Sequence, residues 1–182
     1  VFDKTGTLTK AEPVFQEIIP FGGNDAEEML TLAACLEEHF PHSMAKAVVT
    51  AAQDHHLPHK EMHSKVEYVV AHGIASKVGN RKVRIGSHHF IFEDEKTTIP
   101  AGEEAKFENL PEGCSHLYLA ISNVLSAVIC IKDPVREEAK DVIRELHELG
   151  VKKIVMMTGD SRKNAERVAA EIGIDEVHAE VM

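Results

Sequence analysis

The sequence has few cysteines, fewer basic than acidic residues and no long hydrophobic run, and each of these features argues against a class of protein. Its three cysteines, Cys35, Cys114 and Cys130, lie far apart and form no CxxC pair, so we expect reduced thiols rather than disulfides. The formal net charge of −10 argues against a nucleic-acid or anionic-membrane surface. The most apolar run, Leu117 to Ile131, is broken by polar residues and is shorter than the roughly 20 residues that a membrane span requires.

The remaining composition is that of a soluble globular protein. Hydrophobic residues make up 43% and charged residues 27% of the 182 residues, and this length accommodates one or two domains. No signal peptide, internal repeat or low-complexity tract is recognisable. Function must therefore be sought in short motifs.

The first nine residues, VFDKTGTLT, are the most informative part of the chain. Asp3 follows directly on an apolar stub, which predicts a carboxylate nucleophile at the carboxyl end of a buried strand. A carboxylate that attacks a phosphoryl group forms an aspartyl phosphate. Lys4 would add positive charge where the phosphoryl oxygens gather charge, and Gly6 would let the backbone turn closely around them. The alternative is an ordinary Asp-Lys-Thr-Gly turn at a strand end.

A second phosphate-binding pattern lies far along the chain. Thr158, Gly159 and Asp160 follow an apolar stretch and precede a helical pattern, where a Thr hydroxyl and a Gly amide can bind phosphate oxygens. The alternative is that Asp160 or Ser161 only caps the helix. Because ligands gather at the carboxyl ends of parallel strands, we expect Asp3 and the Thr158-Gly159-Asp160 turn to meet in space.

The middle of the chain predicts two helices on an antiparallel sheet. The helices are expected from Asn24 or Asp25 to near His39 and from Ser43 to His55. Residues with strand patterns, joined by turns at Gly79-Asn80 and Ser122-Asn123, are 66–70, 74–78, 81–85, 117–121 and 124–131.

From Asp133 onward, helices and strands alternate, which predicts a parallel sheet. Asp133 is a natural N-cap for a helix that ends at Gly150. The residues expected on its apolar face are Val135, Ala139, Val142, Ile143, Leu146 and Leu149. A strand over 151–157, a helix over 161–172 and a strand over 176–181 are expected to follow. We predict an α/β fold in which a partial Rossmann-like, parallel-sheet domain carries an inserted α+β domain with a helix hairpin.

The segment from Asp3 to Thr9, DKTGTLT, resembles the phosphorylation motif of the P-type cation-transporting ATPases, and Thr158-Gly159-Asp160 resembles that family's second phosphate-binding motif. The resemblance implies a haloacid-dehalogenase-type phosphorylation domain, residues 1–13 and 127–182, and a nucleotide-binding domain, residues 14–126. It also implies ATP and Mg²⁺ as cofactors.

The same resemblance implies a role for each motif residue. Asp3 accepts the γ-phosphoryl group of ATP, and Asp3 and the Thr5 carbonyl hold Mg²⁺. Lys4 and Thr158 contact the phosphoryl group, while Gly159 and Asp160 shape the site. Phosphatases of the same superfamily carry an acid–base Asp where Thr5 stands here, so the phosphoenzyme should be long-lived. A soluble phosphatase of this superfamily with a cap domain is the alternative, and Thr5 argues against it.

The segment LEEHFPHSMAKAVV resembles the "HP" motif of the heavy-metal-transporting subgroup, which implies that Glu37 and His42 contact adenine. Ser43 stands where this motif has Pro. An amphipathic helix hairpin with a His at its turn is the alternative. The short inserted module and the lack of a KGAPE-like segment also favour this subgroup.

Three further residues and segments resemble nucleotide-binding parts of that subgroup. Gly73 in AHGIAS matches a glycine-rich loop whose outer glycines are replaced here, and Gly86 matches a later glycine turn. The segment from Asp133 to Arg136, DPVR, resembles the point of re-entry into the phosphorylation domain, with Asp133 and Arg136 implied as hinge and nucleotide contacts. For Asp133, a helix cap explains the residue equally well.

The resemblance implies a cytosolic piece of an integral membrane protein, with the plasma membrane as its location. Its partners would be ATP and the protein's own transmembrane and actuator domains, with no nucleic acid, and the transported heavy-metal cation would bind elsewhere. Mg·ATP would bind between the two modules. We expect the fragment to bind nucleotide but to phosphorylate poorly. A non-catalytic metal- or nucleotide-sensing module is a further alternative, although the histidines at 55, 56, 59 and 63 predict a solvated loop rather than a metal site.

Overall fold

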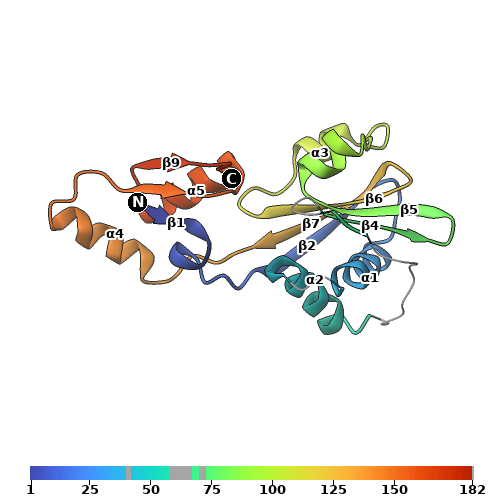
Figure 1. Ribbon diagram of the computed structural model, residues 1–182, viewed down its shortest axis with the longest axis horizontal. Coiled ribbons are helices and arrows are strands. Elements are labelled where there is room, and N and C mark those ends of the chain that lie inside the picture. The colour runs from blue at the N-terminus through green and yellow to red at the C-terminus, as the bar shows by residue number, and fades with distance from the viewer. Residues whose placement is uncertain (40–41, 58–66, 70–72, 182) are drawn as a thin grey trace. The chain divides into compact units, whose positions relative to one another are not determined.

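The computed structural model describes residues 1–39, 42–57, 67–69 and 73–181 (Figure 1). The chain divides into two compact units. The first contains Val1–Val14, Pro111–Ser115 and Lys132–Met182, and the second contains Phe15–Leu110 and His116–Ile131. The second unit is thus inserted into the first, and the predicted boundary at residue 127 falls inside a strand. Which ranges serve phosphorylation and which serve nucleotide binding stays a prediction.

The first unit is built on a three-stranded parallel sheet in the order β1-β8-β9. Its strands are β1 (Phe2–Asp3), β8 (Val155–Met157) and β9 (Glu176–His178), and its helices are α4 (Ala139–Glu148) and α5 (Arg162–Ile172). A short helical turn, η1 (Lys4–Leu8), follows β1. The core between sheet and helices contains Leu8, Ile143, Ile154, Met156, Val168 and Ile172.

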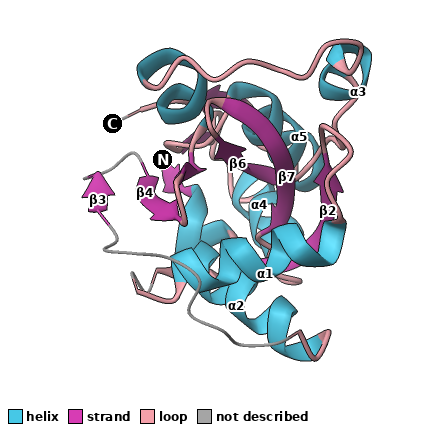
Figure 2. Ribbon diagram, turned by 90° about the vertical axis from the view of Figure 1, so that its right-hand side faces the viewer, coloured by secondary structure: helices cyan, strands magenta, loops and turns pink. Residues whose placement is uncertain are grey.

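The second unit is built on a six-stranded sheet in the order β2-β7-β6-β5-β4-β3. The strands are β2 (Val14–Pro20), β3 (Glu67–Val69), β4 (Gly73–Val78), β5 (Arg81–Gly86), β6 (Ser115–Ile121) and β7 (Val124–Lys132). Strands β3 to β6 pair antiparallel. Helices α1 (Ala26–Glu37) and α2 (Ser43–Asp54) lie together beside this sheet (Figure 2).

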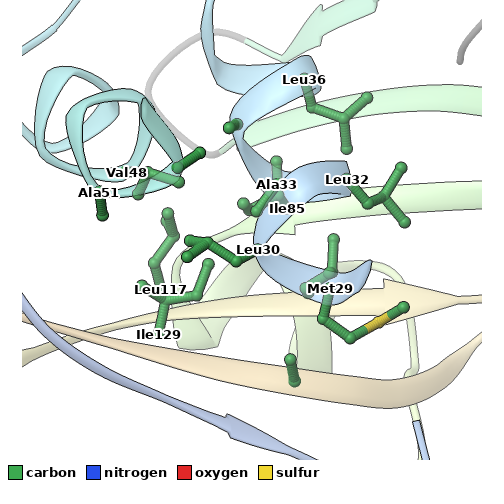
Figure 3. Close-up of a cluster of buried hydrophobic side chains, with 14 of the residues drawn as sticks. Met29, Leu30, Leu32, Ala33, Leu36, Val48, Ala51, Ile85, Leu117 and Ile129 are labelled. Carbon is green, nitrogen blue, oxygen red and sulfur yellow. The ribbon is translucent and has the colours of Figure 1, made fainter. Parts of the chain in front are cut away.

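Both faces of the larger sheet are covered. Leu117 and Leu119 of β6 join the core under α1 and α2, where Leu30, Val48 and Ile129 also meet (Figure 3). The residues that alternate with them in β6, beginning with Tyr118, join a second core. Because successive strand residues point to opposite faces, this second core lies on the other side of the sheet. It is formed with η2 (His89–Asp94) and the segment of α3 (Glu104–Glu108), and contains Phe21, Phe90, Phe92 and Phe107.

Local sequence signals explain several element ends. The Asp25 side chain accepts a hydrogen bond from the Glu28 amide and so caps α1, as predicted. Ser122 and Asn123 both have positive φ, which suits the two-residue turn between β6 and β7. Gly173 ends α5 in the left-handed conformation. The predicted α/β fold, with a parallel sheet and a separate antiparallel sheet carrying a helix pair, is confirmed.

The prediction that Asp133 caps a helix is wrong. Helix α4 begins at Ala139, with Glu138 at the N-cap position. Two residues assigned to its apolar face, Val142 and Leu149, are 43% and 83% exposed. The strands expected over 151–157 and 176–181 are also shorter, because only β8 and β9 form ladder pairs there. Ala139 and Ile143 of the same predicted stripe are buried in the core of the first unit, so the helical periodicity identified only part of the face that meets the sheet.

Three smaller expectations can be compared with the described residues. No disulfide joins the three cysteines, all of which are described. No described helix has the length and apolar character that crossing a bilayer demands. Of the histidine cluster, His55 and His56 follow α2 and are exposed, whereas His59 and His63 lie outside the described residues.

Candidate active site

The carboxyl ends of β1 and β8 bring the two predicted phosphate motifs to one edge of the small sheet. Phe2 pairs with Met156 and Asp3 pairs with Met157 in a parallel ladder. The chain turns immediately after each pair, into Lys4 on one strand and Thr158 on the other. Asp3 is exposed, and its side chain caps no amide of the following turn. Its carboxylate is therefore accessible at the place where ligands bind in parallel α/β sheets.

The turn after Asp3 owes its shape to two residues with non-helical backbone angles. Thr5 is extended, and Gly6 has a φ of +83°, which residues with a Cβ rarely adopt. The chain closes on itself through a hydrogen bond from the Thr9 amide to the Lys4 carbonyl. Leu8, at the end of the turn, is buried in the core of the first unit and so anchors the turn to it.

Lys4 is buried, with only 4% of its surface exposed. Its ammonium lies 3.1 Å from Asp160 Oδ2. A buried charge needs a partner of opposite sign, so Asp160 stabilises the Lys4 ammonium and holds it in place. Asp160 also accepts hydrogen bonds from the Ser161 amide and from Asn164 Nδ2. Ser161 occupies the N-cap position of α5, but its side chain accepts no hydrogen bond from an amide of that helix. The prediction that the Ser161 side chain caps the helix is therefore wrong.

The Thr158-Gly159-Asp160 turn is held by backbone bonds from the end of β9. Thr158 is buried, and its hydroxyl accepts a hydrogen bond from the Asp160 amide. The Thr158 amide donates to the His178 carbonyl, and its carbonyl accepts from the Val181 amide. A Cβ at Gly159 would lie 3.3 Å from the Val181 carbonyl oxygen, which leaves little room for a side chain there.

Asp133 lies behind the phosphorylation turn. Its Oδ2 is 2.5 Å from the Thr9 hydroxyl, which in turn accepts a hydrogen bond from the Gly6 amide. The other carboxylate oxygen, Oδ1, is buried without a hydrogen-bond partner in the described structure. Asp133 therefore acts on the turn through Thr9.

Arg136 holds the same turn from another side. Its guanidinium donates to the carbonyls of Thr7 and Gly6, at 2.9 and 3.2 Å. Its backbone amide donates to the Leu8 carbonyl, and the Lys10 amide donates to the Pro134 carbonyl. The segment from Asp133 to Arg136 thus braces the turn. The predicted nucleotide contacts of Asp133 and Arg136 stay predictions.

Glu37 and His42 meet at the end of α1 and the start of α2. Nδ1 of His42 accepts a hydrogen bond from the Ala45 amide and caps α2, while Nε2 lies 3.2 Å from Glu37 Oε2. Hydrogen bonding to Glu37 raises the pKa of His42, although partial burial opposes this shift. Glu37 is 98% buried, and apart from the His42 imidazole its Oε2 has no donor among the described residues. An acceptor in this state suits a ligand that carries an N–H group.

The two glycines singled out in the inserted unit face each other. Gly73 of β4 pairs with Gly86 of β5. A Cβ at Gly73 would lie 2.4 Å from the Ile85 carbonyl oxygen and 2.6 Å from the Phe90 ring. Close packing therefore accounts for Gly73, and a role in nucleotide binding stays a prediction.

The site also contains residues that the sequence did not single out. Asn164 and Arg167 of α5 continue the contacts of Asp160, since Arg167 donates to Asn164 Oδ1 and to the Gly113 carbonyl. Thr9 was seen only as the last residue of the motif. Arg167 and Thr9 carry no sequence signal for these roles, because their partners Gly113 and Asp133 lie in distant parts of the chain. Asn164 lies one helical turn after Asp160, and this spacing was the local signal that could have found it.

The first unit thus has an accessible carboxylate, a buried ammonium and a Thr-Gly turn at one sheet edge. A family model of haloacid dehalogenase-like hydrolases matches residues 1–181. The chain belongs to this family of hydrolases. Within it, this haloacid dehalogenase-like hydrolase is 37% identical to copper-transporting ATPase 2 of Rhizobium meliloti over 99% of the chain, and 35% identical to the zinc-exporting P-type ATPase of Mycobacterium marinum over 100% of the chain.

The chain covers only 21% and 25% of the lengths of those two relatives. Its fold is also similar to the crystal structure of a zinc-transporting PIB-type ATPase in the E2.Pi state, with a TM-score of 0.70 and 30% identity. That match covers 99% of this chain and 28% of the other. The similarity of this hydrolase to heavy-metal P-type ATPases, which the motifs predicted, is confirmed.

Proposed function

We propose that the chain is the ATP-binding and phosphorylation part of a heavy-metal-transporting P-type ATPase, exposed to the cytosol from a larger protein of the plasma membrane. The observation that carries this proposal is the parallel pairing of Asp3 with Met157, which starts the DKTGT and TGD turns from adjacent strand ends. The relatives named above are copper-transporting and zinc-exporting ATPases. A heavy-metal cation is therefore the proposed cargo, bound in a part of the protein outside this chain.

In the proposed reaction, an Asp3 carboxylate oxygen attacks the γ-phosphorus of ATP. The bond from that phosphorus to the bridging oxygen breaks, ADP leaves, and an aspartyl phosphate remains. Lys4 and Thr158 stabilise the charge on the transferred phosphoryl oxygens, while Gly159 and Asp160 keep the turn and the Lys4 ammonium in place.

Asp3 and the Thr5 carbonyl would hold Mg²⁺, which supplies charge neutralisation on the phosphates when bound. Both are oxygen donors of the kind that Mg²⁺ prefers, and the Asp3 side chain is exposed and free to reach an ion. Thr5 has no carboxylate and cannot act as a base toward water. The proposed aspartyl phosphate therefore persists, as a transport cycle requires.

In the inserted unit, Glu37 and His42 are proposed to bind adenine. Apart from the His42 imidazole, the buried Glu37 Oε2 has no donor among the described residues, and the exocyclic amine of adenine is a second donor that it would accept. Gly73 and Gly86 keep the backbones of β4 and β5 close together on the same unit. The partners expected for the whole protein are its own transmembrane and actuator domains.

The decisive experiment is titration calorimetry of the chain with Mg²⁺ and a non-hydrolysable ATP analogue. We expect binding that Glu37→Gln weakens by about tenfold, as the loss of one hydrogen bond to a charged group predicts. Glu27→Gln is the matched control, because Glu27 is exposed on the same helix. Equal affinity in wild type and Glu37→Gln would reject the adenine assignment.

If the chain is instead a soluble phosphatase, it should hydrolyse simple phosphate esters by itself. Rapid hydrolysis of p-nitrophenyl phosphate, lost in Asp3→Asn, would favour that enzyme over the transporter. In the longer protein we expect instead an acid-stable phosphoenzyme, formed from ATP, that hydroxylamine cleaves and Asp3→Asn abolishes.

A further inference from the structure

The segment from Pro111 to Ser115 belongs to the first unit, although the residues on both sides of it, up to Leu110 and from His116, belong to the second. Three side-chain contacts hold it, two to residues of α5 and one to Asp160, which precedes that helix. Lys163 pairs with Glu112 at 2.5 Å, Arg167 donates to the Gly113 carbonyl at 3.0 Å, and Ser115 contacts Asp160 at 3.4 Å. We call residues 111–115 the tether.

The contacts that hold the tether continue directly to the candidate active site. Arg167 donates to Asn164 Oδ1 at 3.4 Å, and Asn164 Nδ2 donates to Asp160 Oδ2 at 2.5 Å. The same Asp160 oxygen lies 3.1 Å from the Lys4 ammonium. Asn164 is buried, so each of its polar groups depends on these partners.

The fit between Arg167 and the tether is close. Gly113 has a φ of +86°, and a Cβ at this position would lie 2.5 Å from Arg167 Nε. No side chain can be added there without displacing the guanidinium. Arg167 is also paired with Glu171 at 3.1 Å, one turn along α5, which keeps the guanidinium in a fixed orientation.

We propose that Asn164 and Arg167 are positioning residues that couple the docked state of the tether to the position of the Lys4 ammonium. When the tether leaves α5, Arg167 and Asn164 lose partners, Asp160 loses its orientation, and Lys4 is held less firmly. The coupling itself is independent of ATP. Its consequence for catalysis rests on the proposed function, in which Lys4 contacts the transferred phosphoryl group. The Asp160 carboxylate is the element that both the tether and Lys4 contact.

The test measures the reactivity of Lys4 without any nucleotide. The chain is treated with a limiting amount of an acetylating N-hydroxysuccinimide ester, and the modification of Lys4 is quantified by peptide mass spectrometry relative to the exposed Lys140. Hydrogen exchange of the tether amides in the same samples reports whether the tether is docked. Circular dichroism melting confirms that each variant is folded.

Two variants should release the tether by different routes. Arg167→Met removes the guanidinium, and Gly113→Ala displaces it. In both we expect faster exchange of the tether and a Lys4 labelling rate about 3- to 10-fold higher, the effect of losing one or two hydrogen bonds of ordinary strength. Arg167→Lys, which keeps a donor and the charge, should restore slow labelling in part.

Gly150→Ala is the matched control for Gly113→Ala. Gly150 has a similar φ of +95° in the same unit, but a Cβ there meets no atom within 4 Å. It introduces the same backbone strain without touching Arg167, so Lys4 labelling should stay at the wild-type rate. An equal rise in Gly150→Ala would show general loosening and would overturn the proposal.

The proposal is also overturned if the tether exchanges faster in Arg167→Met and Gly113→Ala while Lys4 labelling stays unchanged, or if neither quantity changes. A separate titration of the wild-type chain with Mg²⁺ and beryllium fluoride, a mimic of the phosphoryl group, tests the site itself. Absence of binding there would count against the proposed function, whereas the labelling result would still decide the coupling.

Discussion

The Thr9 hydroxyl lies 2.5 Å from Asp133 Oδ2, although 124 positions separate the two residues in the chain. The Lys4 carbonyl, at 3.2 Å from the same hydroxyl, already accepts the Thr9 amide. The hydroxyl hydrogen is therefore assigned to Asp133, and the hydroxyl oxygen remains available to accept the Gly6 amide. One side chain thus connects the phosphorylation turn to the point at which the chain returns to the first unit.

Thr9→Val should destabilise the protein by about 2–3 kcal/mol, because it leaves the half-buried Asp133 carboxylate and the Gly6 amide without partners. Urea unfolding of wild type and variant measures the difference. Thr7→Val is the control, since Thr7 is exposed in the same turn, and it should change stability by less than about 0.5 kcal/mol. Equal effects of the two substitutions would refute the bracing role of Thr9.

Arg136→Met should loosen the same turn, because it removes the donors to the Gly6 and Thr7 carbonyls. We expect a stability loss of about 1–2 kcal/mol and faster hydrogen exchange of the amides from Thr5 to Thr9. Arg144→Met is the comparison, since the ion pairs that Arg144 forms with Asp141 and Glu148 on α4 are exposed and their loss should matter little. Unchanged exchange in Arg136→Met would contradict the role given to Arg136.

The pKa of His42 should lie above its ordinary value of 6.5, because hydrogen bonding to Glu37 raises it more than partial burial lowers it. A raised folded-state pKa means that the charged pair stabilises the fold below the unfolded pKa and that this contribution disappears as pH rises through the folded value. An NMR titration of His42 should thus shift downward in Glu37→Gln and remain in place in Glu27→Gln. The stability of wild type relative to Glu37→Gln should also be greater at pH 6 than at pH 8.

Gly73→Ala should be strongly destabilising, by about 3 kcal/mol, since the new Cβ would overlap the backbone of β5 and could not be relieved by a side-chain movement. Gly23→Ala provides a contrast. Gly23 has a positive φ but open space around it, so only the backbone strain of about 1 kcal/mol is expected. Thermal unfolding of both variants checks the order, and a Gly73→Ala protein as stable as Gly23→Ala would mean that β4 and β5 can separate.

Much of the fold followed from local patterns. The N-cap at Asp25, the turn at Ser122-Asn123 and the end of α5 at Ile172 depend on residues within a few positions of one another, so the sequence revealed them. The Asp133 helix cap was wrong for the opposite reason. Its carboxylate could satisfy either a helix amide or a distant hydroxyl, and only the folded chain places Thr9 within reach.

The sequence by itself determined that a carboxylate would stand at the end of a strand and that a Thr-Gly turn would stand at the end of another, because each depends on a short stretch of backbone. The tertiary structure decided that these strands are neighbours, that Asp160 partners Lys4, and that Leu149 of the apparent apolar stripe is exposed. Such choices depend on which surfaces meet when the chain packs, and the hydrophobic and electrostatic free energies that decide them are summed over residues far apart in sequence.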